Sequence, residues 1–251
     1  MKVLAIISSL RKKNTYNTIK QIESIHNSID ECEYEYLFLR EVNLKNCRGC
    51  HLCLTKGEQF CPHKDDRDLI INKIESSDAV ILASPNHTMN VNWLMKNFID
   101  RFSYIMHRPK YFNQRFMIVI TSGSYPGIKQ ATNALAPIVS GGKIISRLSV
   151  MISPGMNEKK KKKQDDKIIT EAKKFSKILK NKFEFKSSFG YLVWFSAFKA
   201  TAEMSKQYFP ADYEYYKNKQ FFEDTKLKIH EIFMVYFFTS LFRYLIKMGL
   251  I

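Results

Sequence analysis

The chain has 251 residues, of which 45% are hydrophobic and 25% charged, and its formal net charge is +16 at neutral pH. This apolar content supports a sizeable core and excludes a wholly disordered chain, and the length suits one large domain or one domain with an appendage. The sequence has no run of 18 uncharged apolar residues, which argues against a spanning helix. It also has no helix-turn-helix, zinc-finger or RNP-type pattern, so we expect no nucleic-acid partner.

Five consecutive lysines, residues 159–163, account for part of the charge, and we expect them in a solvated loop. The apolar run of residues 1–7 is too short for a signal peptide, so we expect a mature, cytoplasmic chain.

Short apolar runs alternate with segments of helical periodicity over the first 182 residues. We predict strands at residues 2–7, 34–39, 79–83, 116–121 and 143–152, and helices at 15–29, 65–76, 92–104, 127–139 and 165–182. The runs are short and rich in β-branched residues, as in strands that are buried on both faces. Five strands alternating with five helices predict an α/β fold, with a doubly wound, five-stranded parallel sheet in three α/β/α layers.

Residues from about 185 onward do not continue this alternation. They are rich in aromatic side chains and end in an amphipathic segment, residues 229–251. We therefore predict one α/β domain at residues 1–184 and a helical extension at 185–251, which packs on the sheet domain or across a dimer. A helix on a membrane surface is the alternative, because Lys226, Lys228, Arg243 and Lys247 add positive charge to this segment.

Three loops follow predicted strands at the edge where open parallel sheets bind their ligands. The first, residues 8–18, brings hydroxyls, an amide and Arg11 to a helix N-terminus, which suits a phosphate, although a turn that only caps a helix looks the same. The second, residues 84–92, offers amide and hydroxyl partners for the polar rim of a flat heterocycle. In the third, residues 122–127, Gly123 and Gly127 allow a close approach of the backbone to a ligand.

Residues 43–64 form a cysteine loop, in which Cys47, Cys50, Cys53 and Cys61 fall within fifteen residues. This density predicts metal or redox chemistry and not disulfides. Four thiolates suit an iron–sulfur cluster or tetrahedral zinc, and three close ligands followed by a more distant one favour a [4Fe–4S] cluster. Free or redox-active thiols and zinc are the alternatives, and His51 and His63 could substitute as ligands.

Four segments carry a resemblance to a known family: Ser9-Leu10-Arg11-(x)2-Asn14-Thr15, the loop from Cys47 to Asp66, Ala83-Ser84-Pro85, and Met95 to Arg101. In this order they resemble the NADPH-dependent FMN reductase and iron–sulfur flavoprotein family over residues 1–180. That family is flavodoxin-like and uses FMN to pass electrons from NAD(P)H or ferredoxin-type donors to small acceptors. The chain departs from the family at Ser8, where glycine is usual, and at Leu10, where proline is usual.

By position, the resemblance assigns cofactor contacts to three groups of residues. It implies that the FMN phosphate is held by Ser9, Arg11, Asn14 and Thr15. It implies that the isoalloxazine ring is lined by Ser84, Pro85, Asn86, His87, Thr88 and Asn90, with Ser122 and Gly123 nearby. It also implies a homo-oligomer, in which the cysteine loop of one subunit approaches another subunit's flavin.

The function implied by the resemblance is FMN-dependent electron transfer from NAD(P)H to a quinone, flavin, azo or nitro compound or to a redox protein. Because the cofactor carries the chemistry, no acid–base residue is assigned as catalytic. An iron–sulfur flavoprotein acting as an electron-transfer relay is the alternative if the cluster is present. A non-enzymatic membrane-surface or binding module is the second alternative.

Overall fold

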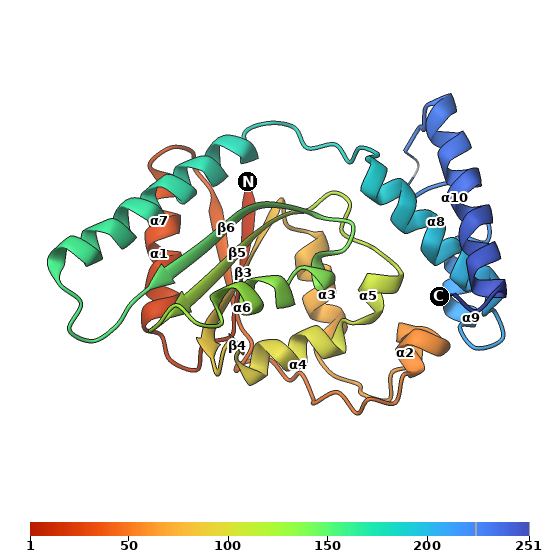
Figure 1. The fold of residues 1–251 in the computed structure, drawn as a ribbon. Helices are drawn as coiled ribbons and strands as arrows, with labels where there is room; N and C mark the ends of the chain where they lie inside the picture. Colours follow the sequence, from red (N-terminus) through yellow and green to blue (C-terminus); the bar gives the residue numbers. More distant parts are fainter. Residues whose placement is uncertain (224, 251) are drawn as a thin grey trace.

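The computed structural model describes residues 1–223 and 225–250 and contains one six-stranded sheet (Figure 1). Five strands pair in parallel in the order β2-β1-β3-β5-β6, while the short β4 pairs antiparallel with the end of β3. The strand bounds are β1 (Lys2–Ile7), β2 (Glu33–Phe38), β3 (Ala79–His87), β4 (Asn90–Val91), β5 (Arg115–Ser122) and β6 (Lys143–Met151). With the β4 hairpin set aside, this is the strand order of a flavodoxin-like sheet, and the predicted fold class is confirmed.

Helices cover both faces of the sheet, and each face has its own apolar cluster. α1 (Asn14–Asn27) and α7 (Glu158–Leu179) pack on one face through side chains that include Ile19 and Phe175. α3 (Arg67–Glu75), α4 (Trp93–Arg101) and α6 (Ile128–Ala134) belong to the other face. Alternation along β1 sends Val3, Ala5 and Ile7 to the first cluster and Leu4 and Ile6 to the second.

Three further helices follow the sheet domain and have an apolar cluster of their own. They are α8 (Phe189–Met204), α9 (Pro210–Tyr216) and α10 (Ile229–Lys247), and they lie together at the end of the molecule that is remote from α7 (Figure 1). Their cluster is mostly aromatic and includes Phe195, Tyr216 and Phe222. The extension is therefore helical, as predicted.

Among the described residues, α10 is the one helix that is long and apolar enough to cross a membrane. The mean hydropathy of its 18-residue window is 1.3, and only 11% of that window is buried. This helix is not an uncharged run of 18 residues in the sequence, because Glu231 and Arg243 interrupt it.

The structure differs from the predicted elements in two segments predicted as loops and at the ends of helices. The segment predicted as a loop at 84–92 is mostly strand, since β3 continues to His87 and β4 follows it, and the cysteine loop contains α2 (Leu52–Thr55) and a 3₁₀ turn, η1 (Glu58–Phe60). α7 begins at Glu158, so the lysine run is helical and not a loop, although the lysine side chains are exposed as expected. The segment predicted as one helix at 92–104 contains α4 and a separate short α5 (Tyr104–His107). The helix predicted at 127–139 likewise divides into α6 and a 3₁₀ turn, η2 (Pro137–Val139). Apolar residues keep their helical spacing through both breaks in the sequence. The sequence pattern therefore does not show that the helix is interrupted there.

Candidate functional site

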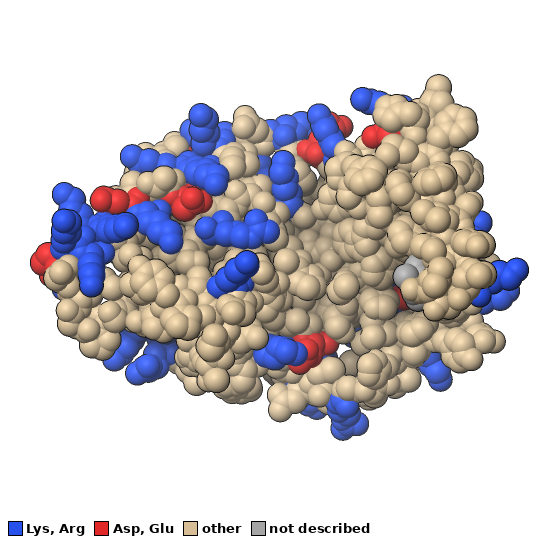
Figure 2. All heavy atoms as spheres, in the orientation of Figure 1, with Lys and Arg blue, Asp and Glu red and all other residues tan. Residues whose placement is uncertain are grey.

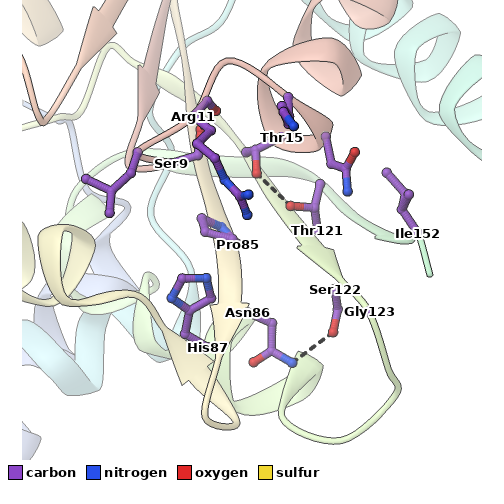
Figure 3. A pocket seen from close by; sticks show the side chains of 13 residues that line it. Ser9, Arg11, Thr15, Pro85, Asn86, His87, Thr121, Ser122, Gly123 and Ile152 are labelled. Carbon is purple, nitrogen blue, oxygen red and sulfur yellow. Dashed lines mark hydrogen bonds between the residues drawn. The ribbon is translucent and has the colours of Figure 1, made fainter. Parts of the chain in front are cut away.

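A cavity of about 350 Å³ opens at the carboxyl ends of the parallel strands, between the loops that follow β1, β3 and β5 (Figure 3). Its volume is within the range of small-molecule sites. Arg11 and Lys13 are among its lining residues, and no carboxylate is among them. The cavity is therefore suited to an anionic ligand.

One end of the cavity lies at the N-terminus of α1. Lys13 stands at the N-cap position and its side chain makes no capping hydrogen bond, so the N–H groups of the first turn lack a side-chain partner. Thr15 and Thr121 share a hydroxyl–hydroxyl hydrogen bond of 2.7 Å, which ties this turn to the end of β5 (Figure 3). A helix N-terminus with a guanidinium and hydroxyls beside it is a favourable place for a phosphate group.

The other end of the cavity is formed by Pro85, Asn86 and His87 at the end of β3, opposite Ser122 and Gly123. The Asn86 amide nitrogen donates to Ser122 Oγ at 2.9 Å (Figure 3). It also donates to the Pro126 carbonyl at 2.8 Å, and the two bonds fix the amide plane. The Asn86 amide oxygen is buried and has no partner among the described residues. An unpaired oxygen here fits a ring system that carries N–H groups on its polar edge, as the isoalloxazine of FMN does.

Asn92 joins the first loop to the second from behind the cavity. Its side chain is almost fully buried, its amide nitrogen donates to the Ser8 carbonyl at 2.6 Å, and its oxygen caps α4 by accepting from the Met95 N–H at 3.1 Å. The Asn92 N–H donates to Ser84 Oγ at 3.3 Å. One residue, through its side chain and its backbone N–H, thus holds the β1 loop, the end of β3 and the start of α4 in a fixed relation.

Replacing Asn92 by Ala is expected to lower the free energy of unfolding by about 2–4 kcal/mol, because it removes a helix cap and leaves the buried Ser8 carbonyl unpaired. Asn92→Asp keeps the cap but places a buried carboxylate oxygen against the Ser8 carbonyl, so it should be at least as destabilising as Asn92→Ala. Urea unfolding of the three proteins measures the effect. Equal stability of Asn92→Ala and wild type would show that Asn92 does not carry this role.

The structure brings nine of the twelve predicted cofactor residues to this one cavity: Ser9, Arg11, Asn14, Thr15, Pro85, Asn86, His87, Ser122 and Gly123. Ser84, Thr88 and Asn90 do not line it. Ser84 is fully buried and donates to the Pro85 carbonyl, and Thr88 lies in the turn of the β3–β4 hairpin, with a positive φ. Gly127 permits a close approach to the hairpin and not to a ligand, because a Cβ there would lie 2.1 Å from Met89 Cα.

Four residues line the cavity that the sequence did not assign: Leu10, Lys13, Thr121 and Ile152. The carboxyl-end rule points to Ile152, because it follows β6 directly. We expected Thr121 to belong to a buried strand. It lines the cavity because it lies next to the carboxyl end of β5, which extends to Ser122.

The second candidate site is the cysteine loop, where Cys47, Cys50, Cys53 and Cys61 all line one small cavity of about 30 Å³. All four are free thiols, two of them exposed and two half-buried. His51, His63 and Arg101 line the same cavity. Within residues 1–223 and 225–250, no three His, Cys, Asp or Glu side chains converge closely enough to hold a single metal ion. The loop thus gathers four sulfur donors, the set that both iron–sulfur clusters and zinc use, without converging them on one ion.

Two side chains of α4, Arg101 and Asn97, hold the cysteine loop in place. Arg101 makes two contacts with the Asp65 carboxylate, at 2.5 and 2.9 Å, and donates to the Lys45 carbonyl at 2.6 Å. The same guanidinium lies 3.9 Å from Cys61 Sγ. One turn earlier, the Asn97 amide oxygen accepts from the Cys47 N–H at 3.0 Å.

Asp65 and Arg101 form a buried pair, with side chains 0% and 2% exposed. Burial alone raises the pKa of Asp65, but the Arg101 contacts and the N–H of Lys45 outweigh it and hold the pKa below the ordinary carboxyl value. The carboxylate is therefore ionised at neutral pH.

Arg108 links the C-terminal extension to the cysteine loop. Its guanidinium donates to the Cys53 carbonyl at 2.5 Å, pairs with Glu58 at 3.0 Å and pairs with Asp212 of α9. The other oxygen of Asp212 lies 2.8 Å from His107 Nδ1. Asp212 of the extension thus fixes the arginine that holds the backbone of Cys53.

The half-buried Cys53 thiol has a shifted pKa. Burial raises its pKa, and the nearby thiols of Cys47 and Cys61 raise it further against the opposing charge of Arg108. As a free thiol it would stay protonated at neutral pH and react slowly. A coordinated metal takes the place of that proton.

The chain matches the model of a family described as NADPH-dependent FMN reductase over residues 1–157. An iron–sulfur flavoprotein of Archaeoglobus fulgidus is 40% identical over 111 residues, which cover 43% of this chain and 49% of that protein. A second protein of the same name from the same organism is 30% identical over 155 residues, covering 61% of this chain and 75% of the relative. The chain therefore spans about half the length of the first relative and three quarters of the second.

Among solved structures, the NAD(P)H:quinone oxidoreductase of Methanothermobacter marburgensis superposes with a TM-score of 0.55 at 12% identity. The match covers 74% of this chain and 99% of that one. At this identity the similarity establishes the shared fold.

Proposed function

The chain belongs to the NADPH-dependent FMN reductase family of flavin oxidoreductases, and from this we propose that it binds FMN and passes electrons from NAD(P)H to a small acceptor. A quinone, flavin, azo or nitro compound is the acceptor class that we expect. The observation that carries the proposal is the cavity of about 350 Å³. It combines the uncapped N-terminus of α1 with the buried amide oxygen of Asn86, which has no hydrogen-bond donor among the described residues.

The two ends of this cavity assign the parts of the cofactor. Arg11, Thr15 and the N–H groups of α1 would hold the phosphate, and Pro85, Asn86 and His87 would flank the ring. FMN, when bound, supplies the capacity to accept a hydride and release electrons, so the protein has only to bind and orient it. Ser122 Oγ, which accepts from Asn86 and donates to the Ser124 carbonyl, keeps the ring end of the cavity rigid.

A second candidate function is supported by the cysteine loop. Four free cysteines share one cavity beside a buried arginine, and the two relatives described above are named iron–sulfur flavoproteins. We propose that Cys47, Cys50, Cys53 and Cys61 hold a [4Fe–4S] cluster, which would let a two-electron donor serve one-electron acceptors. Arg101 would offset part of the negative charge that four thiolates bring to the loop.

Purification without oxygen, with flavin, iron and sulfide measured per chain, tests both proposals. Flavin with about four irons and four sulfides supports the relay, and flavin alone supports a plain reductase. A protein that binds no added FMN and does not oxidise NADH or NADPH with a quinone would contradict the first proposal.

Replacing Arg11 by Ala is expected to weaken FMN binding by about 10- to 100-fold, because a charge-assisted hydrogen bond to the phosphate is lost. The matched control is Lys12→Ala, which removes the same charge from the same loop at a side chain that does not line the cavity. Titration of flavin fluorescence gives both affinities. Equal losses in the two variants would mean that Arg11 acts only through the overall charge.

A further inference from the structure

The surface of α10 that faces away from α8 is exposed and strongly apolar. Two phenylalanines near its middle, Phe233 and Phe237, are 70% and 63% exposed. Other large side chains repeat at helical spacing along the same surface: Ile229, Tyr236, Leu241, Tyr244 and Met248. We call these seven side chains the α10 face. Soluble monomers rarely expose so large a continuous apolar patch without using it.

The opposite side of α10 packs on α8. Val235 and Thr239 are buried against α8, the Val235 carbonyl accepts from Ser196 Oγ at 3.2 Å, and Arg243 Nε donates to Glu203 at 2.7 Å. α10 is therefore apolar on two sides, whereas α8 covers only one. A helix that is apolar all round is expected in a protein core or in contact with lipid.

The charges around the α10 face indicate its partner. Residues 226–247 contain four cationic side chains, Lys226, Lys228, Arg243 and Lys247, and one carboxylate, Glu231, and Arg243 is already paired with Glu203 of α8. Both oxygens of Glu231 are engaged, by Ser187 Oγ at 2.6 Å and by the Lys228 N–H at 2.7 Å. Figure 2 shows the region over α8 and α10 largely free of charge, with basic side chains and a few acidic ones at its rim.

A second copy of the chain is a poor partner for this face. Lysines stand at both ends of α10, so that a parallel and an antiparallel pairing of two such helices would each bring like charges together. An anionic bilayer places its headgroups beside these lysines and its acyl chains beneath the aromatic side chains.

We propose that α10 docks flat on an anionic lipid bilayer, inserting the α10 face at the boundary between headgroups and acyl chains. A flat position keeps the Arg243–Glu203 pair and the contacts with α8, which a spanning position would break.

Co-sedimentation of the full, FMN-loaded protein with vesicles tests the proposal. Vesicles of phosphatidylcholine with phosphatidylglycerol should bind it, vesicles of phosphatidylcholine alone should bind it much less, and added salt should weaken the binding. Phe233→Ser/Phe237→Ser should lower the partition coefficient by about 10- to 100-fold, because two large apolar groups no longer insert. Flavin absorbance of each variant verifies that the sheet domain is intact.

Two control variants identify the surface that is used. Leu69→Ser/Ile169→Ser removes exposed apolar side chains from α3 and α7 and should leave binding unchanged. Lys160→Gln/Lys162→Gln lowers the charge of α7 and should reduce binding far less than the phenylalanine pair does. Loss of binding in this lysine variant alone would overturn the proposal, as would no binding at low salt. A dimer that the phenylalanine changes dissociate, without vesicle binding, would assign the α10 face to self-association instead.

Discussion

Replacing Arg101 by Ala is expected to lower the free energy of unfolding by about 3–5 kcal/mol, because it leaves the buried Asp65 carboxylate without its partner. The Asp65 side chain has no exposed surface, so its charge is hydrated far less than in the unfolded chain when the guanidinium is removed. The Lys45 carbonyl loses a donor at the same time. We therefore expect the cysteine loop to loosen first, since Lys45 and Asp65 stand on either side of it.

Denaturant unfolding measures the loss, and α4 offers a matched control. Lys96 pairs with Asp100 on the exposed side of the same helix, so that Lys96→Ala also breaks an ion pair and should cost less than about 1 kcal/mol. Similar losses in the two variants would show that burial does not distinguish the Arg101 pair. Circular dichroism before unfolding distinguishes a folded variant of low stability from one that never folds.

The same pair predicts a dependence on acid. The pKa of Asp65 is lower in the folded protein than in the unfolded chain, so its stabilising contribution is complete above the ordinary carboxyl pKa. It is lost as the pH falls through the lower folded value. Arg101→Ala should therefore show a weaker loss of stability with acid than wild type over that range.

The fold could be predicted from the sequence because its strands are both local and extreme in composition. A stretch such as residues 79–83 is apolar without interruption, and a sheet buried on both faces accepts little else. The cavity followed from the fold, since the carboxyl ends of parallel strands meet at one edge. Its finer boundary did not follow, because Ser84 and Asn86 lie two residues apart yet only Asn86 reaches the cavity.

Contacts between distant segments were beyond prediction. In the sequence, Asp212 is one acidic residue in an aromatic-rich segment, and Arg108 is a basic residue between a predicted helix and a predicted strand. In the structure they form a buried pair whose arginine also binds the Cys53 carbonyl. Nothing in the spacing of two residues 104 positions apart marks such a pair, because the desolvation that selects it exists only once α9 has packed on the loop.

Replacing Cys53 by Ala is expected to remove nearly all iron and sulfide from the purified protein while flavin stays at wild-type occupancy. Cys53 lies on α2 (Leu52–Thr55), and its carbonyl is fixed by Arg108, so a neighbouring residue cannot readily move into its place. The FMN cavity shares no lining residue with the cysteine cavity, and the change should leave flavin binding intact. Cys32→Ala is the matched control, because Cys32 is a buried thiol beside His26 and outside the loop.

The three interpretations of the loop give different results in this experiment. A cluster predicts iron and sulfide in wild type and in Cys32→Ala but not in Cys53→Ala, with the broad visible absorption of iron–sulfur proteins lost in the same pattern. Zinc predicts zinc without sulfide in that pattern, and free thiols predict no metal in any of the three proteins. Arg108 holds the Cys53 carbonyl but supplies no sulfur. Arg108→Ala should therefore lower the iron content although all four thiols are still present. Full iron occupancy in that variant would show that the contact between Arg108 and the Cys53 carbonyl plays no part in holding the metal.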